Sequence, residues 1–252
     1  MSARGEKGQG RCADDHREGA KRINHVRLWE TRDALYTAQA SRRWHVAEER
    51  GIRYRLGMRR IVLTGGPGAG KTVISRTIVD RSGGRLVMVP ESATQVYSAW
   101  QRRRDQLDVA QRREVQRQIY ALQLQQEAEL AARSPDQVML LDRGTLDGAC
   151  YWPDGVEDYW GHMKTTHEAE LARYDAVILM QSGAALGVYD GSASNAIRWE
   201  DAKAAIEAGE RLKRVWGAHP RFYFVPAHAE LADKAAEVSG LIDRLLNEEG
   251  RD

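Results

Sequence analysis

The segment 65–72 has the composition of a loop that binds phosphate groups. It reads Gly-Gly-Pro-Gly-Ala-Gly-Lys-Thr and follows the apolar run 61–64, which fits the pattern of Gly, four residues, Gly-Lys and then Ser or Thr. Glycine can adopt backbone angles that are closed to other residues, so successive N–H groups can point into one concavity at a helix N-terminus. The sequence therefore predicts that the chain binds a nucleotide through this loop.

Two side chains of the loop are expected to act on the phosphates and the metal. Lys71 would reach the β- and γ-phosphates of ATP, and the hydroxyl of Thr72 would be a ligand of Mg²⁺. Lys71 is for this reason also a predicted catalytic residue. The residues predicted to contact the nucleotide are Gly65, Gly66, Pro67, Gly68, Ala69, Gly70, Lys71, Thr72 and Val73.

The elements that position this loop follow from the pattern of apolar runs. Runs that are apolar throughout, without alternation, are typical of parallel strands covered on both faces. We predict an α/β fold with a doubly wound five-stranded parallel sheet, and with the phosphate loop this predicts a P-loop NTPase. One helix is expected over residues 70 to about 80, and a long helical region after the second strand ends near 132. The predicted strands are 60–64, 86–89, 138–141, 176–180 and 222–225.

Polar residues directly after the strands are the next candidates, because ligands bind at the carboxyl ends of strands in open α/β sheets. Asp142 is predicted to lie beside the Thr-bound Mg²⁺, and a capping or turn Asp is the alternative. Glu91 is predicted to accept a proton from an acceptor hydroxyl or to complete the surroundings of Mg²⁺, with a first-turn helix Glu as the alternative. Arg143 would hold phosphate or substrate, although a structural ion pair explains a single Arg nearly as well.

Arg198 is a further predicted catalytic residue. It follows a segment rich in Gly, Ser and Asp at 182–195, and an Arg on a closing segment would neutralise charge in the transition state of phosphoryl transfer. A helix-start Arg paired with Asp201 is the alternative.

Two clusters leave their roles open. The aromatic segment 151–160, which follows Asp147, could stack a flat substrate through Tyr151, but a hydrophobic cap over the sheet is the favoured interpretation. Asp147 and Tyr151 are both kept as predicted substrate residues. The arginines at 102–104 and 112–113 could meet a phosphorylated substrate, and a solvated helical face is favoured.

Composition limits the class of protein. Of the 252 residues, 42% are hydrophobic, which is enough for a core, and the net charge of +2 gives no general reason to expect a nucleic acid partner. No apolar stretch approaches the length of a membrane span, and two cysteines far apart in the sequence suit a reducing compartment. We expect a cytoplasmic protein without a membrane partner.

The first 57 residues differ from the rest. They hold 13 Lys and Arg residues against 8 Asp and Glu residues, and we expect a basic, flexible extension in which 24–50 could form a helix. An alternative is that the natural protein begins at Met58, directly before the first strand. The P-loop NTPase domain is expected to span 58–250.

Taken together, these motifs resemble a known family. The phosphate loop, Pro90-Glu91, Asp142-Arg143-Gly144 with Asp147, and Arg198 are similar to those of the small AAA-domain predicted ATPases related to nicotinamide-riboside kinase. The resemblance spans about residues 58–230. It implies a P-loop fold of the nucleoside and nucleotide kinase type. It also implies that Glu91 acts on the acceptor hydroxyl, Asp142 on the metal and Arg143 on phosphate, and that Arg198 belongs to a lid.

The leading hypothesis is a Mg²⁺-dependent kinase that transfers the γ-phosphoryl group of ATP to a hydroxyl of a small, nucleoside-like acceptor. The alternative is a nucleotide-switched ATPase or GTPase that binds a partner and has no small-molecule acceptor. A third option is an ATPase that contacts nucleic acid through the basic extension. The absence of an Asn-Lys-x-Asp guanine-reading segment favours ATP over GTP.

Overall fold

The computed structural model describes residues 44–46, 53–55, 58–187 and 202–248. The chain divides into two units, 1–56 and 57–252. In the first unit, β1 (Trp44–Val46) and β2 (Arg53–Arg55) pair in the antiparallel direction. Strand β1 falls within 24–50, so a helix over that whole range is wrong, and the remainder of the range lies outside the described residues.

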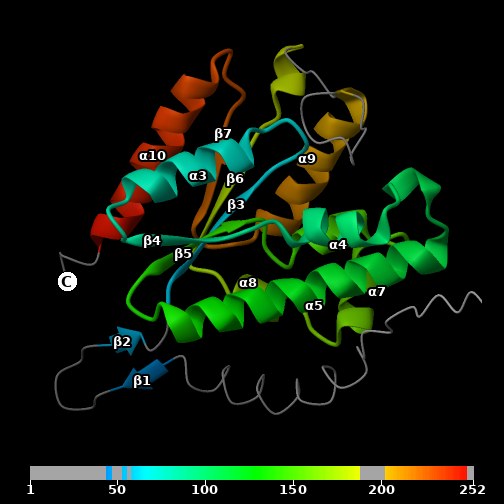
Figure 1. Cartoon of the computed structure of the whole chain (residues 1–252), viewed down its shortest axis with the longest axis horizontal. Helices are drawn as coiled ribbons and strands as arrows, with labels where there is room; N and C mark the ends of the chain where they lie inside the picture. Colours follow the sequence, from blue (N-terminus) through cyan, green and yellow to red (C-terminus); the bar gives the residue numbers. More distant parts are fainter. Residues whose placement is uncertain (1–43, 47–52, 56–57, 188–201, 249–252) are drawn as a thin grey trace, which may run out of the picture. The chain divides into compact units, whose positions relative to one another are not determined.

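Five parallel strands form the centre of the second unit, in the order β4-β5-β3-β6-β7 (Figure 1). This confirms the predicted doubly wound sheet. The third predicted strand is one residue longer than expected, because Asp142 pairs with Leu63 of the neighbouring strand. The bounds are β3 (Arg60–Thr64), β4 (Leu86–Val89), β5 (Val138–Asp142), β6 (Ala176–Met180) and β7 (Phe222–Val225).

Helices cover both faces of this sheet, which explains why its strands are apolar throughout. Helices α3 (Lys71–Arg81) and α10 (Leu231–Asn247) lie on one face, opposite α5 (Val109–Arg133) (Figure 1). Successive residues of β3 point to opposite faces: Ile61 joins the cluster under α3 and α10, whereas Val62 joins the other. The second face also carries α6 (Asp147–Tyr151), α7 (Val156–Met163) and α9 (Ala202–Trp216). Two short elements, α8 (His167–Leu171) and η2 (Gly183–Leu186), also belong to this unit.

The long helical region predicted after the second strand is two helices joined by a turn. Helix α4 (Ser92–Trp100) ends at Gln101, which has a left-handed φ of 51°. The 3₁₀ turn η1 (Arg104–Gln106) follows, and Asp108 then caps α5 by accepting a hydrogen bond from the backbone N–H of Gln111 at 2.8 Å. This turn lets α4 fold back along α5.

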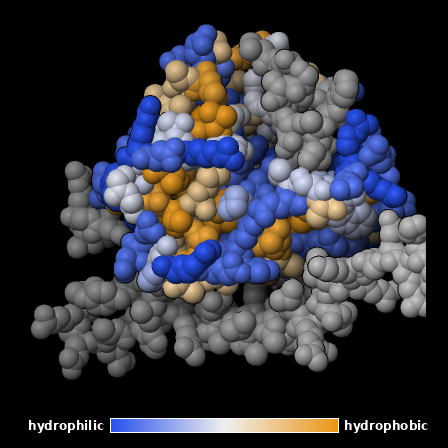
Figure 2. Space-filling view, in the orientation of Figure 1, coloured by the Kyte–Doolittle hydropathy of each residue, from blue (hydrophilic) through white to orange (hydrophobic). Residues whose placement is uncertain are grey.

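The surface of α5 is strongly polar. The helix has 25 residues, and Figure 2 shows mainly hydrophilic side chains over the face of α5 that is in view. Nowhere in the described part of the chain is a helix both long and apolar enough to cross a membrane.

We predict that Leu140→Ala lowers the free energy of unfolding by about 2–5 kcal/mol, because Leu140 is fully buried at the centre of the sheet and its truncation leaves a cavity. Denaturant unfolding followed by circular dichroism measures the change. The matched control is Val109→Ala, at a side chain that is 49% exposed, where the change should stay below about 0.5 kcal/mol. Equal effects at the two positions would contradict the assignment of the core.

Candidate functional site

The predicted phosphate loop connects the end of β3 to α3. Gly65 has a φ of +148°, and a Cβ at this position would lie 2.2 Å from the carbonyl oxygen of Met180 at the end of β6. Gly70 has a φ of +84° and immediately precedes α3. Both positions require glycine. A side chain at Gly65 would clash with the neighbouring backbone, and the positive φ at Gly70 would strain any other residue.

Helix α10 packs against this loop from the end of the chain. The buried Lys234 donates from Nζ to the carbonyl oxygens of Gln181 at 2.7 Å and Ala69 at 3.4 Å. A Cβ on Gly70 would lie 2.6 Å from Cδ1 of Leu231. Burial lowers the pKa of Lys234. The shape of the loop therefore depends on α10 as well as on the loop's own glycines.

The side chain of Lys71 folds back onto the phosphate loop. Its ammonium group donates to the carbonyl oxygens of Gly65 at 2.8 Å and Gly66 at 3.1 Å. These contacts hold the cation over the concavity, at the position where a phosphate chain would meet it.

Thr72 and Asp142 meet at the end of β5. The Thr72 hydroxyl donates to Oδ2 of Asp142 at 2.5 Å, because the pairing of Asp142 with Leu63 brings this carboxylate beside the loop. The other oxygen, Oδ1, is buried and has no hydrogen-bond partner among the residues that the structure describes. Burial is the largest influence on the Asp142 carboxyl and raises its pKa, against the opposing effect of Lys71.

This pair fits the requirements of Mg²⁺. A hydroxyl and a buried carboxylate with an unused oxygen are oxygen ligands of the kind that Mg²⁺ takes, and a cation would relieve the cost of burying the charge of Asp142. Among residues 58–187 and 202–248, no group of three or more His, Cys, Asp and Glu side chains could hold a metal by itself. Nucleotide phosphates and water would have to supply the remaining ligands.

Arg143 joins two carboxylates that come from different elements. Its Nε donates to Oε1 of Glu91, which directly follows β4, and its NH1 donates to Oδ2 of Asp147 at 2.8 Å. Burial opposes the charge of Arg143, but the neighbouring Tyr151 and carboxylates outweigh it and raise the pKa of this guanidinium. The arginine is therefore a permanent cation at the edge of the loop.

Asp147 is itself fixed by three donors. Besides Arg143, the Thr64 hydroxyl lies 2.8 Å from its Oδ2, and the indole Nε1 of Trp216 donates to its Oδ1 at 2.8 Å. These donors come from β3, the residue after β5 and α9. Asp147 thus anchors the arginine to the sheet.

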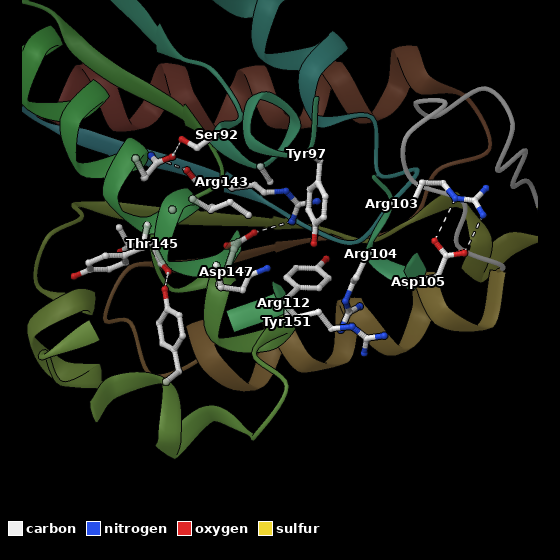
Figure 3. A pocket seen from close by; sticks show the side chains of 18 residues that line it. Ser92, Tyr97, Arg103, Arg104, Asp105, Arg112, Arg143, Thr145, Asp147 and Tyr151 are labelled. Carbon is white, nitrogen blue, oxygen red and sulfur yellow. Dashed lines mark hydrogen bonds and ion pairs between the residues drawn. The ribbon is translucent and has the colours of Figure 1, made fainter. Parts of the chain in front are cut away.

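A cavity of about 390 Å³ lies beside Arg143 and Asp147 (Figure 3). This volume is within the range of small-molecule sites. Its wall contains four tyrosines, two glutamines, apolar side chains and several arginines. The lining residues are Ser92, Ala93, Tyr97, Arg103, Arg104, Asp105, Arg112, Gln116, Ile119, Tyr120, Gln123, Arg143, Gly144, Thr145, Asp147, Gly148, Tyr151 and Tyr159.

The aromatic side chains of segment 151–160 lie in two different places. Trp152, Tyr159 and Trp160 are buried in the core cluster under α5 and α9, as the favoured cap interpretation requires. Tyr151 instead faces the cavity, and its ring centroid lies 5.9 Å from Cζ of Arg143. Tyr151 therefore lines the cavity, and its contact with a substrate stays a prediction.

The structure brings most of the predicted site residues together at one edge of the sheet. Val73 lies in the first turn of α3 and is 58% exposed, and its contact with a nucleotide stays a prediction. Arg198 lies outside the described residues, and its role stays a prediction.

A solvated helical face is the favoured interpretation of the arginines at 102–104 and 112–113, but Arg104 and Arg112 line the cavity. The sequence reasoning missed the tyrosines and glutamines that α4 and α5 add to the wall. These include Tyr97, Gln116 and Tyr120. One signal was available: Asp108 and Gln111 have the spacing of a helix cap and indicate a new helix start within the predicted long helix.

Comparison with protein families places this geometry in a class. A family model described as an AAA domain matches residues 60–234, so the chain belongs to this family of AAA domains. The structure is similar to that of deoxyadenosine kinase from M.mycoides with bound dATP, with a TM-score of 0.52 and 14% sequence identity over 73% of this chain and 99% of that chain. A comparison with curated proteins finds no match.

These findings confirm the resemblance to AAA-domain proteins with a nucleoside-kinase-like P-loop fold. A likeness at 14% identity establishes the fold alone, and the function has to be argued from the site. The specific relation to nicotinamide-riboside kinase stays a prediction.

We predict that Asp142→Asn stabilises the nucleotide-free protein near neutral pH and weakens Mg²⁺-nucleotide binding about 10- to 100-fold. A carboxyl whose pKa is raised on folding stabilises the fold at low pH, and this contribution is lost as the pH rises through the raised pKa. Removing the charge therefore helps stability most at pH 7–8, and the gain should shrink as the pH falls. Denaturant unfolding measured from pH 8 downward gives the change in stability. Calorimetric titration with Mg²⁺-nucleotide gives the change in binding.

The matched control is Asp136→Asn, at an exposed position in the turn before β5. It should change the unfolding free energy by less than about 0.5 kcal/mol and leave nucleotide binding unaltered. An Asp142→Asn protein that is less stable than the wild type at pH 8, or that binds Mg²⁺-nucleotide normally, would show that Asp142 is a structural residue.

Proposed function

We propose that this protein is a Mg²⁺-dependent kinase that transfers the γ-phosphoryl group of ATP to a hydroxyl of a small, nucleoside-like acceptor. The observation that carries the proposal is that Arg143, which is paired with Glu91, lines a cavity of about 390 Å³ and directly follows Asp142, the partner of Thr72. The similarity of the fold to a deoxyadenosine kinase supports it. A protein that only binds and hydrolyses nucleotide has no need of an acceptor-sized cavity at this point.

The phosphate loop would hold the nucleotide through its backbone N–H groups and the charge of Lys71. Thr72 and Asp142 would hold Mg²⁺, which when bound draws negative charge from the phosphates. The ammonium group of Lys71, already directed into the loop, would stabilise charge that develops on the transferred group. Catalysis of this kind depends on positioning and electrostatics.

Glu91 is the proposed proton acceptor. An acceptor hydroxyl at the cavity end near Arg143 would attack the γ-phosphorus, while the bond from that phosphorus to the β–γ bridging oxygen breaks and ADP leaves with the electron pair. The hydroxyl proton passes to the carboxylate of Glu91. Arg143 would orient this carboxylate and the incoming oxygen, because its guanidinium is fixed by Asp147 on the other side.

We predict that Glu91→Gln lowers acceptor-dependent ADP release about 10²- to 10⁴-fold, the usual contribution of a general base, while ATP binding is retained. The assay measures ADP release by the full chain with Mg²⁺ and ATP against a panel of nucleosides and pyridine ribosides. Glu129→Gln, at an exposed position on α5, is the control and should behave as the wild type.

Two results would reject the kinase. The first is tight nucleotide binding without stimulation by any acceptor in the panel. The second is a rate of hydrolysis that Glu91→Gln leaves unchanged. Together they would favour the nucleotide-switched binding protein, whose partner affinity should then depend on the bound nucleotide.

A further inference from the structure

The cavity beside Arg143 has an imbalance of charge. Its lining includes four arginines but only two carboxylates, those of Asp105 and Asp147. Both carboxylates are already engaged, since Arg103 lies 2.9 Å from Asp105 and Arg143 lies 2.8 Å from Asp147. The two remaining arginines, Arg104 and Arg112, have no carboxylate within ion-pair distance among the described residues.

Two arginines next to the cavity on α5, by contrast, do have carboxylate partners. Arg113 lies 2.6 Å from Asp154, and Arg117 lies 3.0 Å from Glu114. The side chains of Arg104 and Arg112 are only partly exposed, and a partly buried cation without a counter-charge is unfavourable. An anionic ligand would supply the missing charge.

Contacts within the wall hold the two guanidinium groups in place. Nε of Arg112 donates to the carbonyl oxygen of Leu107 at 3.0 Å, and the described residues give its terminal NH groups no acceptor. Cζ of Arg104 lies 5.3 Å from the centroid of the Tyr151 ring, a cation–π distance. In Figure 3 both side chains extend toward the same end of the cavity. The planar forks thus remain available for a carboxylate or phosphate.

Tyr151 separates this end of the cavity from the reacting end. The same ring that stacks with Arg104 lies 5.9 Å from Cζ of Arg143, and Figure 3 shows it between the two arginines. A flat ring that packs against Tyr151 could therefore have its sugar hydroxyl near Arg143 and a substituent near Arg104.

We propose that the acceptor is an anionic, ring-containing small molecule, with a carboxylate or phosphate bound by Arg104 and Arg112 at the end away from the reacting hydroxyl. This inference rests on the proposed kinase function and narrows its substrate class from neutral nucleosides to acidic ones. A small molecule is favoured over a polyanion because the arginines line a cavity of about 390 Å³.

The test compares the dissociation constants of acceptors with and without an added anionic group, measured by calorimetry on the full chain with no turnover required. The pairs are uridine with orotidine, and adenosine with adenosine 3′-monophosphate. In at least one pair, the anionic member should bind at least about tenfold more tightly, because bonds to two charged guanidinium groups are gained.

The Arg104→Gln, Arg112→Gln double variant should abolish this preference and leave binding of the neutral member within about twofold. Arg102→Gln, at an exposed arginine outside the cavity, should keep the preference. Thermal unfolding of each variant confirms that it is folded.

The inference is overturned if no pair favours its anionic member, or if the preference survives in the double variant. Failure of the kinase proposal is a different result. It would appear as a lack of acceptor-dependent ADP release, whereas the ratio of dissociation constants reports on the arginines alone.

Discussion

The site depends on one buried carboxylate, that of Asp147. It receives hydrogen bonds from Thr64 on β3, from Arg143 after β5 and from Trp216 on α9. A buried charge is stable only when it is paired and hydrogen-bonded, so these elements are constrained to converge on it. The residues between Arg143 and Asp147 show how tight the fit is, because a Cβ on Gly144 would lie 2.8 Å from the Trp216 ring. The arginine has no freedom to leave the edge of the phosphate loop.

The fold and the nucleotide half of the site were predictable because they follow from local patterns. Continuous apolar runs indicate parallel strands, and residues that follow such strands, including Glu91 and Asp142, must share one edge of the sheet. The strand order was not needed for this conclusion. The register that extends β5 to Asp142 depends instead on pairing with Leu63, a contact between residues far apart in the sequence.

The wall of the cavity was predicted poorly because tertiary contacts decide it. Arg112 fits a solvated helical face as well as a cavity wall until the turn at 101–108 folds α4 back along α5. The choice between these positions depends on the backbone at Gln101 and on the cap at Asp108. Helix α5 is held in turn by buried polar contacts, including the one from Gln123 Nε2 to the carbonyl oxygen of Arg143 at 3.3 Å. The cap at Asp108 has a sequence signal, whereas the left-handed backbone at Gln101 and the contact from Gln123 have none.

The position of α10 against the phosphate loop has a consequence for biosynthesis. Lys234 and Leu231 help to shape the loop around Gly70, yet the ribosome makes α10 after every strand of the sheet. The loop's residues leave the exit tunnel early and must wait for a helix that begins more than 150 residues later. Until α10 emerges, the loop therefore lacks the contacts that Lys234 and Leu231 make with it.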